Sequence, residues 1–227
     1  VVSDKRWKTL LDKDTVYSIL TGTHNFVYAV PVLSPVQLAG KYVGVTHEYF
    51  DFPDGTPHKR LYGIRLLHWA DGGSKQDKLE RDKGLIERAL RTEHDPGMVR
   101  RYLFYLAQTH YDMKLFDRAI HYYKQRIERG GWEEEVFYSY YRAALALLNM
   151  NNGVCTDKVV RWFLRAWQFR KTRLEPLYAI MRHCKDQNQA KVLGELGLPV
   201  KMTDDILFVE ANVYNYDYQK LYNTLLY

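Results

Sequence analysis

A repeated pattern of helix-forming segments constrains this chain more than any other feature of its sequence. Three tyrosine-led tripeptides begin at Tyr105, Tyr141 and Tyr178, with spacings of 36 and 37 residues. Between them, segment 117–127 resembles segment 157–167, and apolar residues recur in both at helical spacing. Two helices in every unit of this length predict a stack of helical pairs, in which each pair buries its apolar face against the next.

A period in the mid-thirties with two helices per unit resembles the tetratricopeptide repeat. Residues 100–133 fit that pattern well, because the small side chains of Ala107 and Ala119 allow two helices to approach closely. Gly130-Gly131 is expected to end the second helix, and a longer loop is expected at 149–153. A third repeat from Glu175 is shorter, as terminal repeats often are.

The N-terminal third has a different pattern. Segments 15–21 and 25–33 are rich in Val, Ile, Tyr and Thr around turn residues, which predicts a β-hairpin, and Pro31 limits central pairing of its second strand. Further strands are expected at 42–46 and 61–68, followed by a long helix at 78–91. We therefore expect a mainly α fold, with a β-rich region at 1–77 and a helical repeat domain at 78–227.

Two expectations concern the C-terminal end. Segment 203–210 has the pattern of a capped helix start, with Thr203 or Asp204 as the cap. The tyrosine-rich segment 214–227 carries many apolar residues, which predicts a helix on the last repeat. A homo-oligomer is compatible with such an aromatic-rich end.

Composition excludes some classes of protein. The formal charge of +6 is spread among nearly as many acidic residues, so nucleic-acid binding is not expected, and the basic segment 165–173 fits a solvated helix end. Cys155 and Cys184 have no metal-ligand spacing, which favours a reducing compartment. No apolar run is long enough for a membrane span and no signal peptide is present, so we expect a soluble, cytoplasmic protein.

Two polar clusters could carry chemistry. His47-Glu48 places an imidazole beside a carboxylate, and the carboxylate could deprotonate an attacking hydroxyl. A structural role, in which Glu48 pairs with a basic residue, remains open. In the second cluster His68 and Asp71 are potential metal ligands, and Asp71-Gly72-Gly73 would let backbone amides approach a phosphate at a helix N-terminus. An ordinary turn before a helix would look the same. Three cations follow it: Lys75, Lys78 and Arg81.

Taken together, these clusters resemble the family-2-like glycosyltransferases of GT-A type that carry C-terminal tetratricopeptide repeats. Six separated motifs occur in the order and approximate spacing of that family: Tyr42-Val-Gly-Val-Thr-His-Glu-Tyr49, Asp71-Gly-Gly-Ser-Lys-Gln-Asp-Lys-Leu-Glu-Arg-Asp82, Arg101-Tyr-Leu-Phe-Tyr-Leu-Ala-Gln108, Gly130-Gly-Trp-Glu-Glu-Glu-Val136, Arg173-Leu-Glu-Pro-Leu-Tyr178 and Asp204-Asp-Ile-Leu-Phe-Val-Glu210. The resemblance runs from about Tyr17 to the end of the chain, and it makes the β-rich region part of a GT-A-like domain.

The resemblance implies transfer of a sugar from a nucleotide-sugar donor to an acceptor nucleophile, with a divalent metal ion, Mn or Mg, and typically with inversion at the sugar. Glu48 would be the acceptor-side base and His47 would shape that site. His68 and Asp71 would lie at the metal or diphosphate position. Lys75, Lys78 and Arg81 would bind phosphate or have structural roles.

One departure from the family limits this interpretation. The family's nucleotide-binding βαβ half and its Asp-x-Asp metal motif would precede these motifs, and by the resemblance Asp4 would be the trailing residue of that metal motif. We therefore expect activity only with an upstream domain or partner chain. Two non-catalytic alternatives remain, both of which leave the β-rich start vestigial. One is a tetratricopeptide-type interaction module, and the other is a structural, for example virion, component of viral or bacterial origin.

Overall fold

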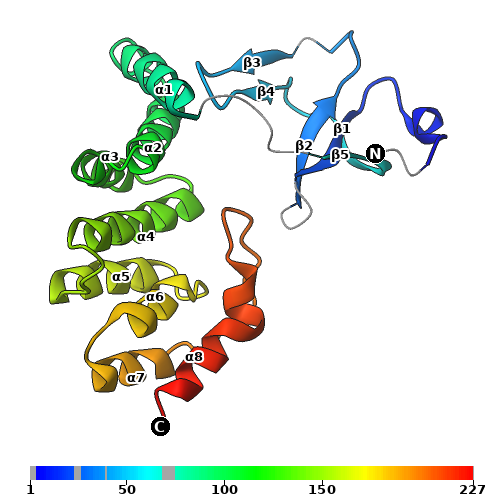
Figure 1. Cartoon of the computed structure of the whole chain (residues 1–227). Helices are drawn as coiled ribbons and strands as arrows, with labels where there is room; N and C mark the ends of the chain where they lie inside the picture. The colour runs from blue at the N-terminus through cyan, green and yellow to red at the C-terminus, as the bar shows by residue number, and fades with distance from the viewer. Residues whose placement is uncertain (1–3, 23–26, 39, 68–74, 227) are drawn as a thin grey trace. The chain divides into compact units, whose positions relative to one another are not determined.

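The computed structural model describes residues 4–22, 27–38, 40–67 and 75–226. It is mainly helical, with short strands near the N-terminus followed by helices, which confirms the expected fold class (Figure 1). The chain divides into two compact units, Val1–Asp77 and Lys78–Tyr227. The division falls in the first turn of helix α1, where the sequence changes from β-rich to helical periodicity.

The first unit contains a three-stranded sheet and a two-stranded one. Its elements are the 3-10 helix η1 (Trp7–Leu10) and the strands β1 (Val16–Gly22), β2 (Val27–Leu33), β3 (Lys41–Val43), β4 (Tyr49–Asp51) and β5 (His58–Leu67). β1 lies centrally, antiparallel to β2 and parallel to β5. β2 is an edge strand, as its proline predicts. Pro31 has no backbone N–H to donate, so it is tolerated in a strand that pairs on one side only.

The core of this unit is small. Tyr17, Ile19 and Leu61 are buried together between β1 and β5, and Trp7 packs against them. The strand expected at 42–46 is shorter than predicted. It ends at Val43 and pairs with β4 instead of continuing, because Gly44, with φ of +114°, turns the chain away from the extended conformation.

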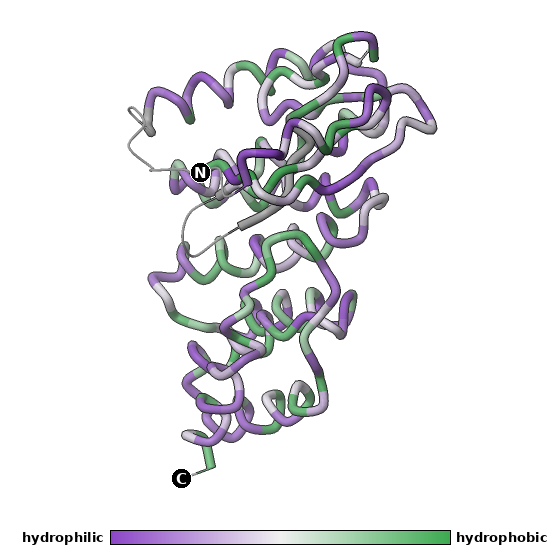
Figure 2. The backbone as a smooth tube through the Cα atoms, turned by 90° about the vertical axis from the view of Figure 1, so that its right-hand side faces the viewer, coloured by the Kyte–Doolittle hydropathy of each residue, from purple (hydrophilic) through white to green (hydrophobic). Residues whose placement is uncertain are grey.

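The second unit is a succession of helices. Their bounds are α1 (Lys75–Leu90), α2 (Pro96–Asp112), α3 (Phe116–Glu128), α4 (Glu133–Met150), α5 (Asp157–Phe169), α6 (Glu175–His183), α7 (Gln187–Glu195) and α8 (Tyr218–Thr224), with a π-helical turn η2 (Val213–Asp217) before α8. From α2 to α7 each helix packs against the next (Figure 1). Hydrophobic and hydrophilic residues alternate along these helices, as amphipathic helices require (Figure 2).

Small side chains let the first helices approach one another. Ala107 of α2, Ala119 of α3 and Ala143 of α4 are buried around the ring of Tyr123. The turn after α3 uses Gly130 and Gly131, both with positive φ, as predicted. Helices α2 to α5 occur at the positions that the sequence predicts for helices. Their membership of the tetratricopeptide family stays a prediction.

The segment after α7 differs from the prediction. Residues 203–210 form no helix; residues 201–210, here called the strap, are irregular. Thr203 Oγ1 accepts a hydrogen bond from the amide of Asp205 at 3.3 Å, which is a local turn and not a helix cap. Beyond the strap the expected terminal helix is present, and Tyr218 Oη donates to the carbonyl of Gly194 at 2.8 Å, which holds α8 on α7. No described helix combines the length and apolar character that a membrane crossing requires.

Candidate functional site

The predicted base lies in the turn between β3 and β4. Val43 pairs with Tyr49, and the five residues between them reverse the chain. Gly44 has φ of +114°, and a Cβ atom there would lie 3.3 Å from the carbonyl oxygen of Thr46 and 3.5 Å from Cα of Glu48. His47 has φ of +52°, the left-handed conformation that non-glycine residues seldom adopt. Two unusual backbone conformations therefore set the direction of the Glu48 side chain.

Glu48 and His47 are both exposed. Within the described part of the chain, the Glu48 carboxylate has no hydrogen-bond or ion-pair partner, so the predicted structural role, pairing with a basic residue, is not seen there. The strand predicted at 42–46 would have placed His47 and Glu48 at its end, but they lie in a hairpin turn. A carboxylate in this position can accept a proton from a bound hydroxyl group.

Aromatic rings flank this turn. Tyr42 and Phe50 face each other across β3 and β4, with their centroids 4.8 Å apart in an edge-to-face arrangement, and Phe52 continues the row at 4.6 Å from Phe50. Phe50 also packs on Gly40, where a Cβ atom would meet its ring at 1.9 Å. A two-stranded hairpin is marginal alone, so these ring contacts fix the turn that carries Glu48.

Asp4, a predicted metal ligand, is bound to a neighbouring cation. Arg6 donates through its amide and through Nε to Asp4 Oδ1, at 2.9 and 3.2 Å, and these bonds hold the pKa of Asp4 below its usual value. The Asp4 amide donates to the carbonyl of Gly63 in β5 at 3.1 Å. Asp4 is thus fixed beside β5, with its carboxylate directed to Arg6.

Most of the residues predicted to bind the metal ion or the donor diphosphate lie outside the described residues. His68, Asp71, Gly72 and Gly73 lie in segment 68–74, and the side chain of Lys75 is not described either. Lys78 is exposed in α1, and Arg81 pairs with buried Asp82 at 3.3 Å, which gives that arginine a structural partner. Among the described residues no three His, Cys, Asp or Glu side chains gather as a metal site. The metal and diphosphate assignments therefore stay predictions.

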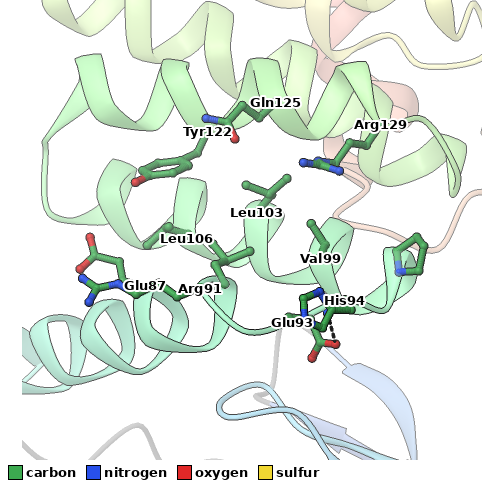
Figure 3. A pocket seen from close by; sticks show the side chains of 12 residues that line it. Glu87, Arg91, Glu93, His94, Val99, Leu103, Leu106, Tyr122, Gln125 and Arg129 are labelled. Carbon is green, nitrogen blue, oxygen red and sulfur yellow. Dashed lines mark hydrogen bonds between the residues drawn. The ribbon is translucent and has the colours of Figure 1, made fainter.

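A groove in the helical unit was not predicted. It has a volume of about 690 Å³ and runs between α1 and α3, with apolar residues of α2 at its floor, among them Leu103 and Leu106 (Figure 3). Charged side chains of both signs line it, including Glu87 and Arg91 from α1 and Arg129 from the end of α3. The repeat pattern identifies these helices, but it does not reveal the space left between them.

The basic segment 165–173 is only in part the solvated helix end that its composition suggested. Arg173 is completely buried and donates to Glu175 Oε1 at 2.8 Å and to Asp205 Oδ2 at 3.2 Å. Arg170 also pairs with Asp205, through both Nε and Nη2. Asp205, which is distant in sequence, thus binds two arginines of this segment, whereas Arg165 and Lys171 are exposed.

Cys155 and Cys184 lie at adjoining ends of neighbouring helices, α5 and α6. Burial, together with a smaller effect of Cys184, raises the pKa of the Cys155 thiol to about 11. Both cysteines are free thiols. A thiol with so high a pKa is a poor nucleophile at neutral pH, so Cys155 is not a catalytic candidate.

Comparisons with known proteins add no family assignment. No family model matches the chain, and a search of curated proteins finds no match either.

Proposed function

We propose that this chain provides the acceptor-side portion of a metal-dependent glycosyltransferase that uses a nucleotide-sugar donor, with Glu48 as the general base. The observation that carries the proposal is the Glu48 carboxylate, exposed on a turn fixed by Gly44 and by the Tyr42–Phe50 contact. Order of the six sequence motifs supports the same assignment. The nucleotide-binding half of such an enzyme would come from an upstream domain or a partner chain.

In this reaction Glu48 accepts the proton of the acceptor hydroxyl as that oxygen attacks the anomeric carbon of the sugar. The bond from the anomeric carbon to the diphosphate oxygen breaks in the same displacement, which inverts the configuration. When bound, a divalent ion, Mn or Mg, would stabilise the charge on the departing diphosphate. The proposed ligands are His68 and Asp71, with Asp4 as a third candidate.

Turnover of a Glu48→Gln variant tests the proposal. Sugar transfer is measured with manganese and a panel of uridine and guanosine diphosphate sugars, using the chain together with any nucleotide-binding segment encoded upstream of it. We expect turnover to fall about 10²- to 10⁴-fold, the usual contribution of a general base, with unchanged donor affinity. Asp54→Asn, an exposed carboxylate in the loop after β4, is the matched control and should keep full turnover. Near-normal turnover of Glu48→Gln would exclude Glu48 as the base.

A second candidate function is a helical interaction module, for which the groove between α1 and α3 is the supporting observation. A chain that only binds partners would neither bind a nucleotide sugar nor respond to Glu48→Gln. Failure of donor binding with the upstream segment present would therefore favour this second function. For either function we propose an intracellular setting, which the free thiols support.

A further inference from the structure

His110 is a buried histidine without a hydrogen-bond partner in the described residues. It lies in the last turn of α2 and is 4% exposed. Neither Nδ1 nor Nε2 has a partner within residues 4–22, 27–38, 40–67 and 75–226. Its ring stacks on that of Tyr122 in α3, with centroids 5.2 Å apart and planes 5° apart. Buried polar groups are nearly always paired, so this imidazole needs an explanation.

Charged groups from two neighbouring helices act electrostatically on His110. Lys83 and Glu87 come from α1, and Asp117 and Arg118 come from α3. His121 of α3 contacts Tyr122, with ring centroids 5.1 Å apart, and pairs with Gln125. The two anions and two cations offset each other, so no counterion is reserved for a protonated imidazole. Burial is the main cause that lowers the pKa of His110, and Glu87 opposes it weakly.

We propose that His110 makes the α1–α2–α3 end of the helical unit acid-sensitive: the three helices stay closed while the imidazole is neutral, and they open when it takes up a proton. The added proton creates a second N–H donor and a positive charge on a buried ring. A cation over the Tyr122 ring gains some attraction, but that attraction does not replace the hydration of an imidazolium ion. Opening lets water reach the ring.

The groove between α1 and α3 would respond to this opening. Tyr122 and Glu87, which both adjoin His110, line the groove (Figure 3). Separation of α1 from α3 at His110 therefore changes the groove's shape. His110 is thus a proton-sensitive contact next to this groove.

The direction of the pH effect follows from the lowered pKa. The unfolded histidine titrates near pH 6.5, and the folded one titrates lower. The closed arrangement of α1, α2 and α3 therefore has its full stability above about pH 6.5. It loses stability relative to the open arrangement as the pH falls toward the folded pKa. Within that window one proton raises the opening equilibrium by up to about tenfold per pH unit.

Residue-resolved hydrogen exchange of the full chain between pH 7.5 and pH 5.0 tests the proposal, after correction for intrinsic exchange rates. We expect protection in α1, the second half of α2 and α3 to fall by up to about tenfold per pH unit below pH 6.5. His110→Phe keeps a ring on Tyr122 but cannot be protonated, so its protection in these helices should not depend on pH. His94→Gln, an exposed histidine of the same groove, is the control and should behave as wild type.

A titration of the wild-type chain makes the test independent of the variant's folding. The His110 Hε1 proton, followed by NMR, should shift with a midpoint below 6.5. His183 of α6, whose pKa is lowered by burial and by Arg182, reports on a separate region and should titrate identically in His110→Phe. A His110 midpoint at or above 6.5 would overturn the proposal, as would pH-independent protection in α1–α3 or an unchanged pH dependence in His110→Phe.

Discussion

Arg173, two residues before α6, binds Asp205 of the strap through Nη1 and Oδ2 at 3.2 Å, and its guanidinium has no exposed surface. Arg173 also donates to the main-chain carbonyls of Leu207 and Phe208, both at 3.1 Å. Glu134 of α4 accepts from the amides of Ile206 and Leu207 at 2.8 and 2.7 Å. Helix side chains thus supply the main-chain hydrogen bonds that the strap does not make with itself.

Asp205→Asn should destabilise the helical unit. The substitution removes the charge that two arginines share and leaves Arg173 with Glu175 as its remaining anion. Removal of one partner from a buried ion pair costs about 3–5 kcal/mol, and we expect the lower end of that range because Glu175 remains. Urea denaturation followed by circular dichroism measures the loss. Asp204→Asn, an exposed neighbour, should stay within about 0.5 kcal/mol of wild type, and equal stabilities of the two variants would contradict the assignment.

The same carboxylate should contribute to acid unfolding. Burial alone would raise the pKa of Asp205, but hydrogen bonds from Arg170 and Arg173 outweigh it and hold the pKa below the usual value. Because the folded pKa is the lower one, the stabilisation is complete above the unfolded pKa, near 3.9, and is lost as the pH falls through the folded value. Stability measured between pH 6 and pH 2.5 should therefore fall less steeply below pH 4 in Asp205→Asn than in Asp204→Asn.

The helices were predictable because their signals are local. Apolar spacing and end signals, such as the N-cap Asp95 and the first residue Pro96 of α2, lie within a few residues of the helix that they specify. The strap was mispredicted because Thr203 and Asp204 are good local helix caps, whereas the partners that hold 205–210 in an irregular conformation lie far away in sequence. Glu134 and Arg173 become neighbours of the strap only after the helices have stacked.

The candidate site was only partly predictable. Residue types and motif order identified His47 and Glu48 as a pair, but the five-residue turn that presents them depends on where β3 stops and which strand it joins. The partner of Asp4 was missed although Arg6 is two residues away, because a metal role was expected for that carboxylate. His110 carries no sequence signal, since only packing shows that its ring nitrogens lack partners in the described part of the chain.

A second buried ion pair fixes the turn between α3 and α4. Arg126 donates to Glu135 Oε2 at 2.9 Å and to the carbonyl of Gly130, and both side chains are nearly inaccessible to solvent. Glu135→Ala leaves the buried guanidinium without its anion, so we expect a loss of about 3–5 kcal/mol in the free energy of unfolding. Glu133→Ala, two residues earlier, breaks an exposed pair with Arg170 and should cost at most about 1 kcal/mol. Equal losses for the two variants in denaturant titrations would show that burial does not strengthen the Arg126–Glu135 contact.

Close packing of α8 on the turn after α7 depends on Gly197. A Cβ atom there would lie 2.1 Å from Tyr218 Oη and 2.8 Å from Leu174 Cδ2, so Gly197→Ala must displace the tyrosine. Overpacking of this kind costs about 1–3 kcal/mol. Gly84→Ala is the opposite case, because its Cβ atom meets only Arg88 at an ordinary 3.5 Å within α1, and alanine should stabilise that helix by about 0.5–1 kcal/mol.

The clash itself can be tested by removing its other partner. Tyr218→Phe alone loses the hydrogen bond to the Gly194 carbonyl, worth about 1 kcal/mol. In that background Gly197→Ala meets a ring without the hydroxyl oxygen and should cost less than it does in the wild-type chain. Thermal unfolding of the wild type, the two single variants and the double variant is followed by near-ultraviolet circular dichroism. The comparison gives the coupling energy between positions 197 and 218. Additive losses would show that Tyr218 Oη does not set the packing at Gly197.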